Sequence, residues 1–72
     1  MKMEKIDSKI KDLNAIRAMH QRDFEDVEKE HREKKMSDKD FEKHKRKHEL
    51  KMEKIKLKIR KLEEEIALLK KL

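Results

Sequence analysis

Hydrophobic residues recur every three or four positions through most of this chain. In the first half the series consists of Met3, Ile6, Ile10, Leu13, Ile16, His20, Phe24, Val27 and His31, with the two histidines included for their spacing. In the second half it consists of Phe41, His44, His48, Met52, Ile55, Ile59, Leu62, Ile66 and Leu69. Steps of three and four return to the same face of an α-helix, so each series predicts one long amphipathic helix. The two series together define the predicted interhelical seam.

The residues between the two series carry the signals of a helix start. Ser37 is a preferred N-cap residue, and Asp40 lies at the third helical position, where its carboxylate can accept a hydrogen bond from the Ser37 N–H. Met36 and Phe41 occupy the two positions of a hydrophobic staple. We therefore expect the chain to leave one helix and to enter another at this point.

These signals predict a single helical hairpin over residues 1–72. Its first helix is expected over about 3–34, its turn over about 35–37 and its second helix over about 38–71. The opposing interpretation is one continuous helix, which the absence of a glycine after the first helix favours. The predicted fold class is all-α, a two-helix antiparallel coiled-coil hairpin.

A fold-back near residue 36 also predicts which residues face one another, because facing positions in an antiparallel pair have numbers with a nearly constant sum. The pairs that add up to 72 are Met3 with Leu69, Ile6 with Ile66, Ile10 with Leu62, Leu13 with Ile59, His20 with Met52, Phe24 with His48 and His31 with Phe41. Arg17 would face Ile55. We expect its neighbour Ile16 to turn into the seam instead, while the arginine stem lies along the edge.

Length and composition limit the size of the core. The chain has 72 residues, of which 56% are charged and 33% hydrophobic. A chain this short buries a modest share of its surface, so a lone hairpin is marginally stable. Pairing of two hairpins into a homodimeric four-helix bundle, or docking of another protein, would add contacts. The apolar residues off the seam that are available to such a partner are Leu50, Leu57, Leu68 and Leu72.

Positive charge gathers at the middle of the predicted rod. The formal net charge is +6. The basic band, defined by its level along the rod, consists of Lys9, Lys11, Arg17, Arg22, Lys47, Lys51, Lys54, Lys56, Lys58, Arg60 and Lys61. Only Asp12, Glu49 and Glu53 are acidic at this level. Nearer the turn, the acidic segment 23–33 lies beside the basic residues of 43–47, and we expect these charges to neutralise one another.

A rod with a band of positive charge favours binding to a polyanion, of which nucleic acid is the commonest in a cell. Contacts to phosphates would release counterions and would not depend on base sequence. The chain has no Tyr or Trp to stack on bases, so duplex DNA or structured RNA is the expected partner, in a small ribonucleoprotein or in chromatin. The alternative is a protein–protein interaction or oligomerisation module, in which the lysine-rich face is simply solvated.

Two resemblances accompany this interpretation. The stretch MSDKDFEKHK is similar to the cap found at the start of many bacterial and archaeal helical hairpins, in which a hydroxyl residue, acids, an aromatic residue and a lysine follow one another. By architecture alone, the predicted hairpin resembles the small RNA-binding helical-hairpin dimers of plasmid copy-number control. That resemblance implies an RNA-binding dimer and carries over no binding residue.

The histidines allow a metal hypothesis. His44 and His48 are four residues apart on one helical face, the spacing at which two side chains can share a metal ion, and Glu28, His20 or His31 could supply a third ligand. The basic residues between them in HKRKH oppose a cation, however, and all four histidines coincide with seam positions where they can simply fill space. We therefore expect no metal and no other cofactor.

Catalysis and membrane insertion find little support. Without glycine the chain has no phosphate-cradling loop, and a two-helix rod offers no enclosed pocket, so we expect neither an enzyme nor a small-molecule substrate. No segment approaches the roughly 18 apolar residues of a membrane span, so we expect a cytoplasmic protein without a membrane partner. One Asn and one Gln beside many Lys and Glu are typical of a thermophilic source.

Overall fold

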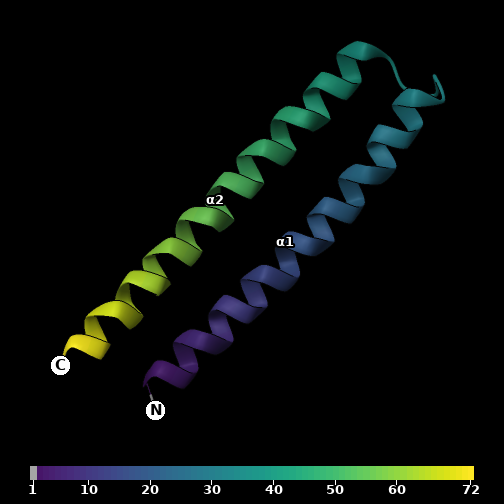
Figure 1. The fold of residues 1–72 in the computed structure, drawn as a ribbon. Helices are drawn as coiled ribbons and strands as arrows, with labels where there is room; N and C mark the ends of the chain where they lie inside the picture. Colours follow the sequence, from purple (N-terminus) through teal and green to yellow (C-terminus); the bar gives the residue numbers. More distant parts are fainter. Residues whose placement is uncertain (1) are drawn as a thin grey trace.

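Two antiparallel α-helices joined by a short connection make up the structure, a computed structural model that describes residues 2–72 (Figure 1). Helix α1 spans Lys2–Arg32 and helix α2 spans Asp38–Lys71, with no strand among the described residues. The molecule measures 55 × 15 × 11 Å. An unbroken helix of this length would reach about 108 Å, so the chain folds back on itself. The predicted all-α helical hairpin is therefore confirmed, and the alternative of one continuous helix is wrong.

Helix α2 begins at the predicted cap. Ser37 has extended backbone angles of φ −71° and ψ 156°, and its hydroxyl accepts a hydrogen bond of 3.2 Å from the Asp40 N–H. The first intrahelical bond follows, with the Phe41 N–H donating to the Ser37 carbonyl at 2.9 Å. The reciprocal bond of a capping box, from the Ser37 N–H to the Asp40 carboxylate, is not formed between these described residues.

Helix α1 ends at Arg32, two residues before the predicted end, and residues 33–37 form the connection. Lys34 adopts a left-handed backbone with φ 59°. Its N–H donates to the His31 carbonyl at 3.1 Å, and the Lys35 N–H donates to the Glu30 carbonyl at 2.9 Å. These two bonds form a Schellman motif, which normally places glycine at the left-handed position. A lysine here costs about 1–2 kcal/mol of backbone strain, which the two bonds offset.

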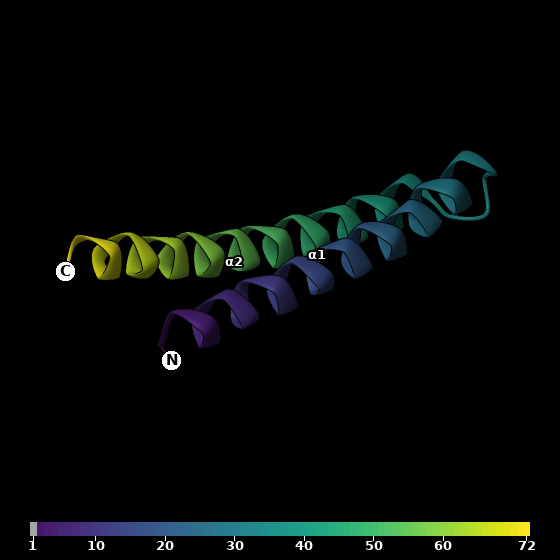
Figure 2. The ribbon, with the colours of Figure 1, turned by 60° about the horizontal axis from the view of Figure 1, so that its bottom comes forward.

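The core is a narrow line between the helices, which cross at a shallow angle (Figure 2). Only Ile6, Ile55 and Ile59 are buried among the described residues. Most other seam residues are half-buried, because each helix has one neighbour and the outer edge of every seam side chain meets water.

Two of the predicted seam residues lie outside the line of contact. Ile16 is 40% exposed and does not turn into the seam as expected. His44 is also exposed. The buried and half-buried seam residues of each helix follow one another at alternating steps of three and four residues. Continuing this alternation places position 17 of α1 and position 45 of α2, rather than positions 16 and 44, nearest the partner helix. Ile16 and His44 each precede these positions by one residue, so they lie at the edge of the seam.

Aromatic rings fill the end of the seam near the turn. His31 stacks on Phe41 with ring centroids 4.1 Å apart and an interplanar angle of 3°. Phe24 stacks on His48 at 4.3 Å and 7°, and the two phenylalanines are 6.0 Å apart. Both histidine–phenylalanine contacts join residues whose numbers add up to 72, so the predicted register is confirmed at these two pairs.

The turn is also held by a polar contact between the helices. His31 Nε2 lies 2.7 Å from Asp38 Oδ1, so the imidazole N–H donates to the carboxylate across the connection. Asp38 is the first residue of α2 and His31 lies in the last turn of α1. The contact therefore joins the two helix ends that the turn brings together.

Candidate functional site

All eleven residues of the basic band lie on the exposed surface of the rod. Within residues 2–72, the ion pairs closer than 4.0 Å are His31 with Asp38 and Lys35 with Glu33, and neither involves a residue of the band. The expected neutralisation between segment 23–33 and the basic residues of 43–47 is thus not made by direct pairs in the described chain. The positive charges of the band face solvent.

Five lysines of the band form a continuous line along α2. They are Lys47, Lys51, Lys54, Lys58 and Lys61, here called the lysine stripe. Their steps of four, three, four and three residues keep them on one helical face, and the stripe extends over about 21 Å at the helical rise. Glu49 and Glu53, the acidic residues of this interval, lie at other steps. The stripe therefore carries five positive charges with no acidic residue between them.

Two other members of the band lie on the opposite edge of the seam. Arg17 and Lys56 line a hollow together with Gln21, His48, Glu49, Met52 and Glu53. On α2, Lys51 comes one residue before the seam residue Met52, and Glu53 comes one residue after it. The side chains of Lys51 and Glu53 therefore point about 100° to either side of Met52 around the helix axis. This second edge mixes both signs of charge. The band predicted from level along the rod is consequently not one surface.

The remaining members of the band are Lys9, Lys11, Arg22 and Arg60. They are exposed. None of them lines the hollow beside Arg17 and Lys56 or a second hollow on the other edge of the seam. The structure thus aligns five of the eleven predicted residues as a single line on α2, and it places Arg17 and Lys56 on the other edge of the seam.

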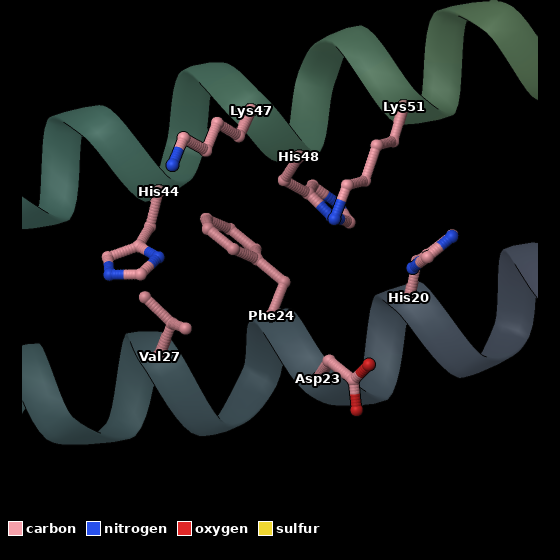
Figure 3. A pocket seen from close by; sticks show the side chains of 8 residues that line it. All are labelled: His20, Asp23, Phe24, Val27, His44, Lys47, His48 and Lys51. Carbon is pink, nitrogen blue, oxygen red and sulfur yellow. The ribbon is translucent and has the colours of Figure 1, made fainter.

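A second hollow lies where the stripe meets the seam, and we call it the histidine hollow. It has a volume of about 130 Å³ and is lined by His20, Asp23, Phe24, Val27, His44, Lys47, His48 and Lys51. Figure 3 shows Lys51 reaching from α2 into the space between the helices and Lys47 running along α2 above His44, with the imidazoles of His20, His44 and His48 between the helices. Two ammonium groups and three imidazoles therefore surround one opening.

Sequence reasoning missed the histidine hollow. It placed His20, His44 and His48 in the seam by their spacing, and it assigned Lys47 and Lys51 to the basic band separately. The signal that could have joined them is the step of three between His44 and Lys47 and between His48 and Lys51, which puts each lysine beside a histidine on the same side of α2.

The histidines do not assemble into a metal site. In the part of the chain that the structure describes, no group of three or more His, Cys, Asp or Glu side chains could hold a metal ion. Of the predicted pair, His48 packs one ring face on Phe24, and His44 lies exposed at the edge of the seam.

Four leucines of α2 and the C-terminus are exposed, as their positions off the seam predict. Leu50 is 59% exposed, Leu57 46%, Leu68 64% and Leu72 101%. Leu50 and Leu57 are seven residues apart, so they share one face of α2, which turns away from α1. Leu50 also lines a shallow depression with Lys43, Arg46 and Lys47. Leu50 is therefore a small apolar area within a mainly basic part of the surface.

None of the described helices combines the length and the apolar character that crossing a membrane requires. Comparison of the chain with protein-family models, with curated proteins and with solved structures finds no match.

Proposed function

We propose that this hairpin docks on the phosphate backbone of nucleic acid through the lysine stripe. The observation that carries the proposal is the uninterrupted line of five exposed lysines, none of which is in an ion pair with another described residue. A protein that needed these lysines for its own fold would pair them with carboxylates. Their free charge supports a partner of opposite charge.

The arrangement suits a duplex or a folded RNA. Successive lysines of the stripe rise by about 4.5 or 6 Å along a rigid helix, and the stripe has the length of about six base pairs of B-DNA at 3.4 Å each. Neither phenylalanine is available to stack on a base, because Phe24 and Phe41 pack on histidines within the seam. The contacts would therefore be made to phosphates and would not depend on base sequence.

Salt dependence tests this function. Five phosphate contacts predict a slope of log affinity against log salt of about −4.5 on B-DNA, which is roughly a 500-fold loss of affinity between 50 and 200 mM salt. The measurement is fluorescence anisotropy with labelled mixed-sequence DNA and RNA duplexes. Absence of binding at 50 mM salt would remove the proposal.

A charge-matched pair of variants locates the site. The test variant replaces Lys51, Lys54, Lys58 and Lys61 with Gln, and the control replaces Lys5, Lys29, Lys39 and Lys70, which are equally exposed and lie off the stripe. Both variants lose four charges, and Gln preserves helix propensity. We expect the slope to fall to about −0.9 in the test variant and to change little in the control. Equal losses would mean that net charge rather than the stripe determines binding.

The exposed leucines support a second candidate, a protein-interaction module. Leu50 and Leu57 expose large apolar side chains to water, and such exposed apolar area favours a protein partner. The lysines around these two leucines favour a partner whose contact surface has an acidic rim. A homodimer through this face would bring two lysine stripes close together, which disfavours it. Light scattering at several concentrations, with Leu50→Gln and Leu57→Gln for comparison, tests self-association. A mass of one chain at every concentration would exclude the four-helix bundle.

A further inference from the structure

The lysine stripe meets the seam between the helices at the histidine hollow. Lys47 and Lys51 belong to both features, since they are the first two lysines of the stripe and also line the hollow. The remaining polar side chains of the hollow are those of His20, His44, His48 and Asp23. Whatever binds along the stripe therefore passes over this opening.

The hollow offers several hydrogen-bond donors, one of them on a ring that a stacking contact holds in place. The ring of His48 is held by its parallel stack on Phe24, at 4.3 Å and 7°, so the nitrogens at its edge stay available. Ammonium groups donate only, and a charged imidazole donates from both nitrogens, which is the chemistry that phosphate oxygens accept. The volume of about 130 Å³ is well above the roughly 10–15 Å³ that one water needs. A tetrahedral anion therefore has both room and donors.

We propose that the histidine hollow binds one phosphate group between Lys51 and the imidazoles. The inference rests on the proposed function for its source of phosphate, the nucleic-acid backbone. Lys47 and Lys51 attract the anion, and the imidazoles of His20, His44 and His48 offer ring N–H groups to its oxygens. Asp23 opposes the anion with a single negative charge.

The first experiment uses inorganic phosphate alone. NMR signals of the histidine rings are followed while phosphate is added at one pH, with chloride at matched ionic strength as the reference. We expect the signals of His20 and His48 to shift with phosphate. The signals of His31, which contacts Phe41 and Asp38 outside the hollow, should stay in place. Equal shifts of all four histidines, or none, would overturn the site.

The second experiment measures the duplex affinity of the variants His20→Gln and His31→Gln at one pH and one ionic strength. His20→Gln should weaken binding about tenfold, the effect of one hydrogen bond to the charged phosphate. His31→Gln lies outside the hollow and should bind as the parent chain does. His20 is the better test residue because it takes no part in the ring stacks, and circular dichroism verifies that both variants keep their helices.

The outcomes separate the two proposals. Duplex binding that His20→Gln leaves unchanged, with no phosphate-induced shift of His20 or His48, would leave the proposed function intact and remove the phosphate site. Phosphate-induced shifts without duplex binding at 50 mM salt would remove the nucleic-acid function and establish the hollow as a site for a free phosphate group. An equal loss of affinity in His31→Gln and in His20→Gln would show that the hollow does not determine binding and would overturn the site.

Discussion

The end of α1 provides a quantitative test of the fold, because Lys34 holds a backbone conformation that favours glycine. Its φ of 59° costs a non-glycine residue about 1–2 kcal/mol. Lys34→Gly removes this cost but adds freedom to the unfolded chain, which takes back about 0.4–1 kcal/mol. The expected net gain is therefore about 0.8 kcal/mol. In a domain of this size that gain raises Tm by roughly 3–6 °C.

Thermal unfolding followed by circular dichroism, at equal protein concentration, measures the effect. Lys35→Gly is the matched control, since Lys35 is the neighbouring lysine and has no positive φ. Glycine at position 35 adds freedom to the unfolded chain without relieving strain, so this variant should melt below the parent chain. Both bonds of the Schellman motif remain in either variant, because they use backbone groups. If Lys34→Gly melted no higher than Lys35→Gly, the left-handed cap would not exist in solution.

Two further predictions concern the N-cap and the core. Ser37→Ala removes the hydroxyl that caps α2, so it should lower the free energy of unfolding measured by chemical denaturation by about 1 kcal/mol. Ser8→Ala, at an exposed position inside α1, should leave that free energy unchanged or raise it slightly. Equal effects of the two variants would contradict the cap. Ile55→Ala empties a site that is 7% exposed and should cost about 2–4 kcal/mol, whereas Ile16→Ala at 40% exposure should cost less than about 1 kcal/mol. A similar loss at both isoleucines would mean that the seam is packed differently.

The register of the hairpin was readable from the sequence, because it depends on spacing alone. Once the turn is placed near residue 36, the steps of three and four fix Phe24 opposite His48 and His31 opposite Phe41, and the rings stack as that register requires. The start of α2 was equally readable, since Ser37 is a residue type that caps helices. In both cases one local rule determined the outcome.

The end of α1 could not be read in the same way. The Schellman motif is made by backbone N–H groups of Lys34 and Lys35 and by carbonyls of Glu30 and His31, which every residue type carries. The expected signal, a glycine, is absent. The need to reverse the chain and join the aromatic pairs favours the left-handed conformation at Lys34 despite its cost.

The candidate site was predicted from the level of its residues along the rod, without regard to the side of the rod that each residue faces. The sequence indicated where basic residues are dense, and it gave no reason to separate Lys51 from Lys56. Their separation follows from helical phase, since Lys51 lines the histidine hollow and Lys56 lines the opposite one with Glu49 and Glu53. The steps of the lysine stripe were present in the sequence. They acquire meaning only once the seam defines which side of α2 they occupy.

The lysine stripe has a cost for the free hairpin that its proposed partner would remove. Each pair of like charges three or four residues apart destabilises a helix by about 0.2–0.5 kcal/mol, so the four consecutive pairs of the stripe oppose folding by about 1–2 kcal/mol. The hairpin has little to set against this, because only three of its described side chains are buried. A polyanion that binds the folded form alone adds about 2.7 kcal/mol of stability at a hundred times its Kd. Salt would then act in opposite directions, screening the repulsion in the free hairpin while weakening the contacts in the complex. The proposed function thus accounts for a charge arrangement that the fold by itself disfavours.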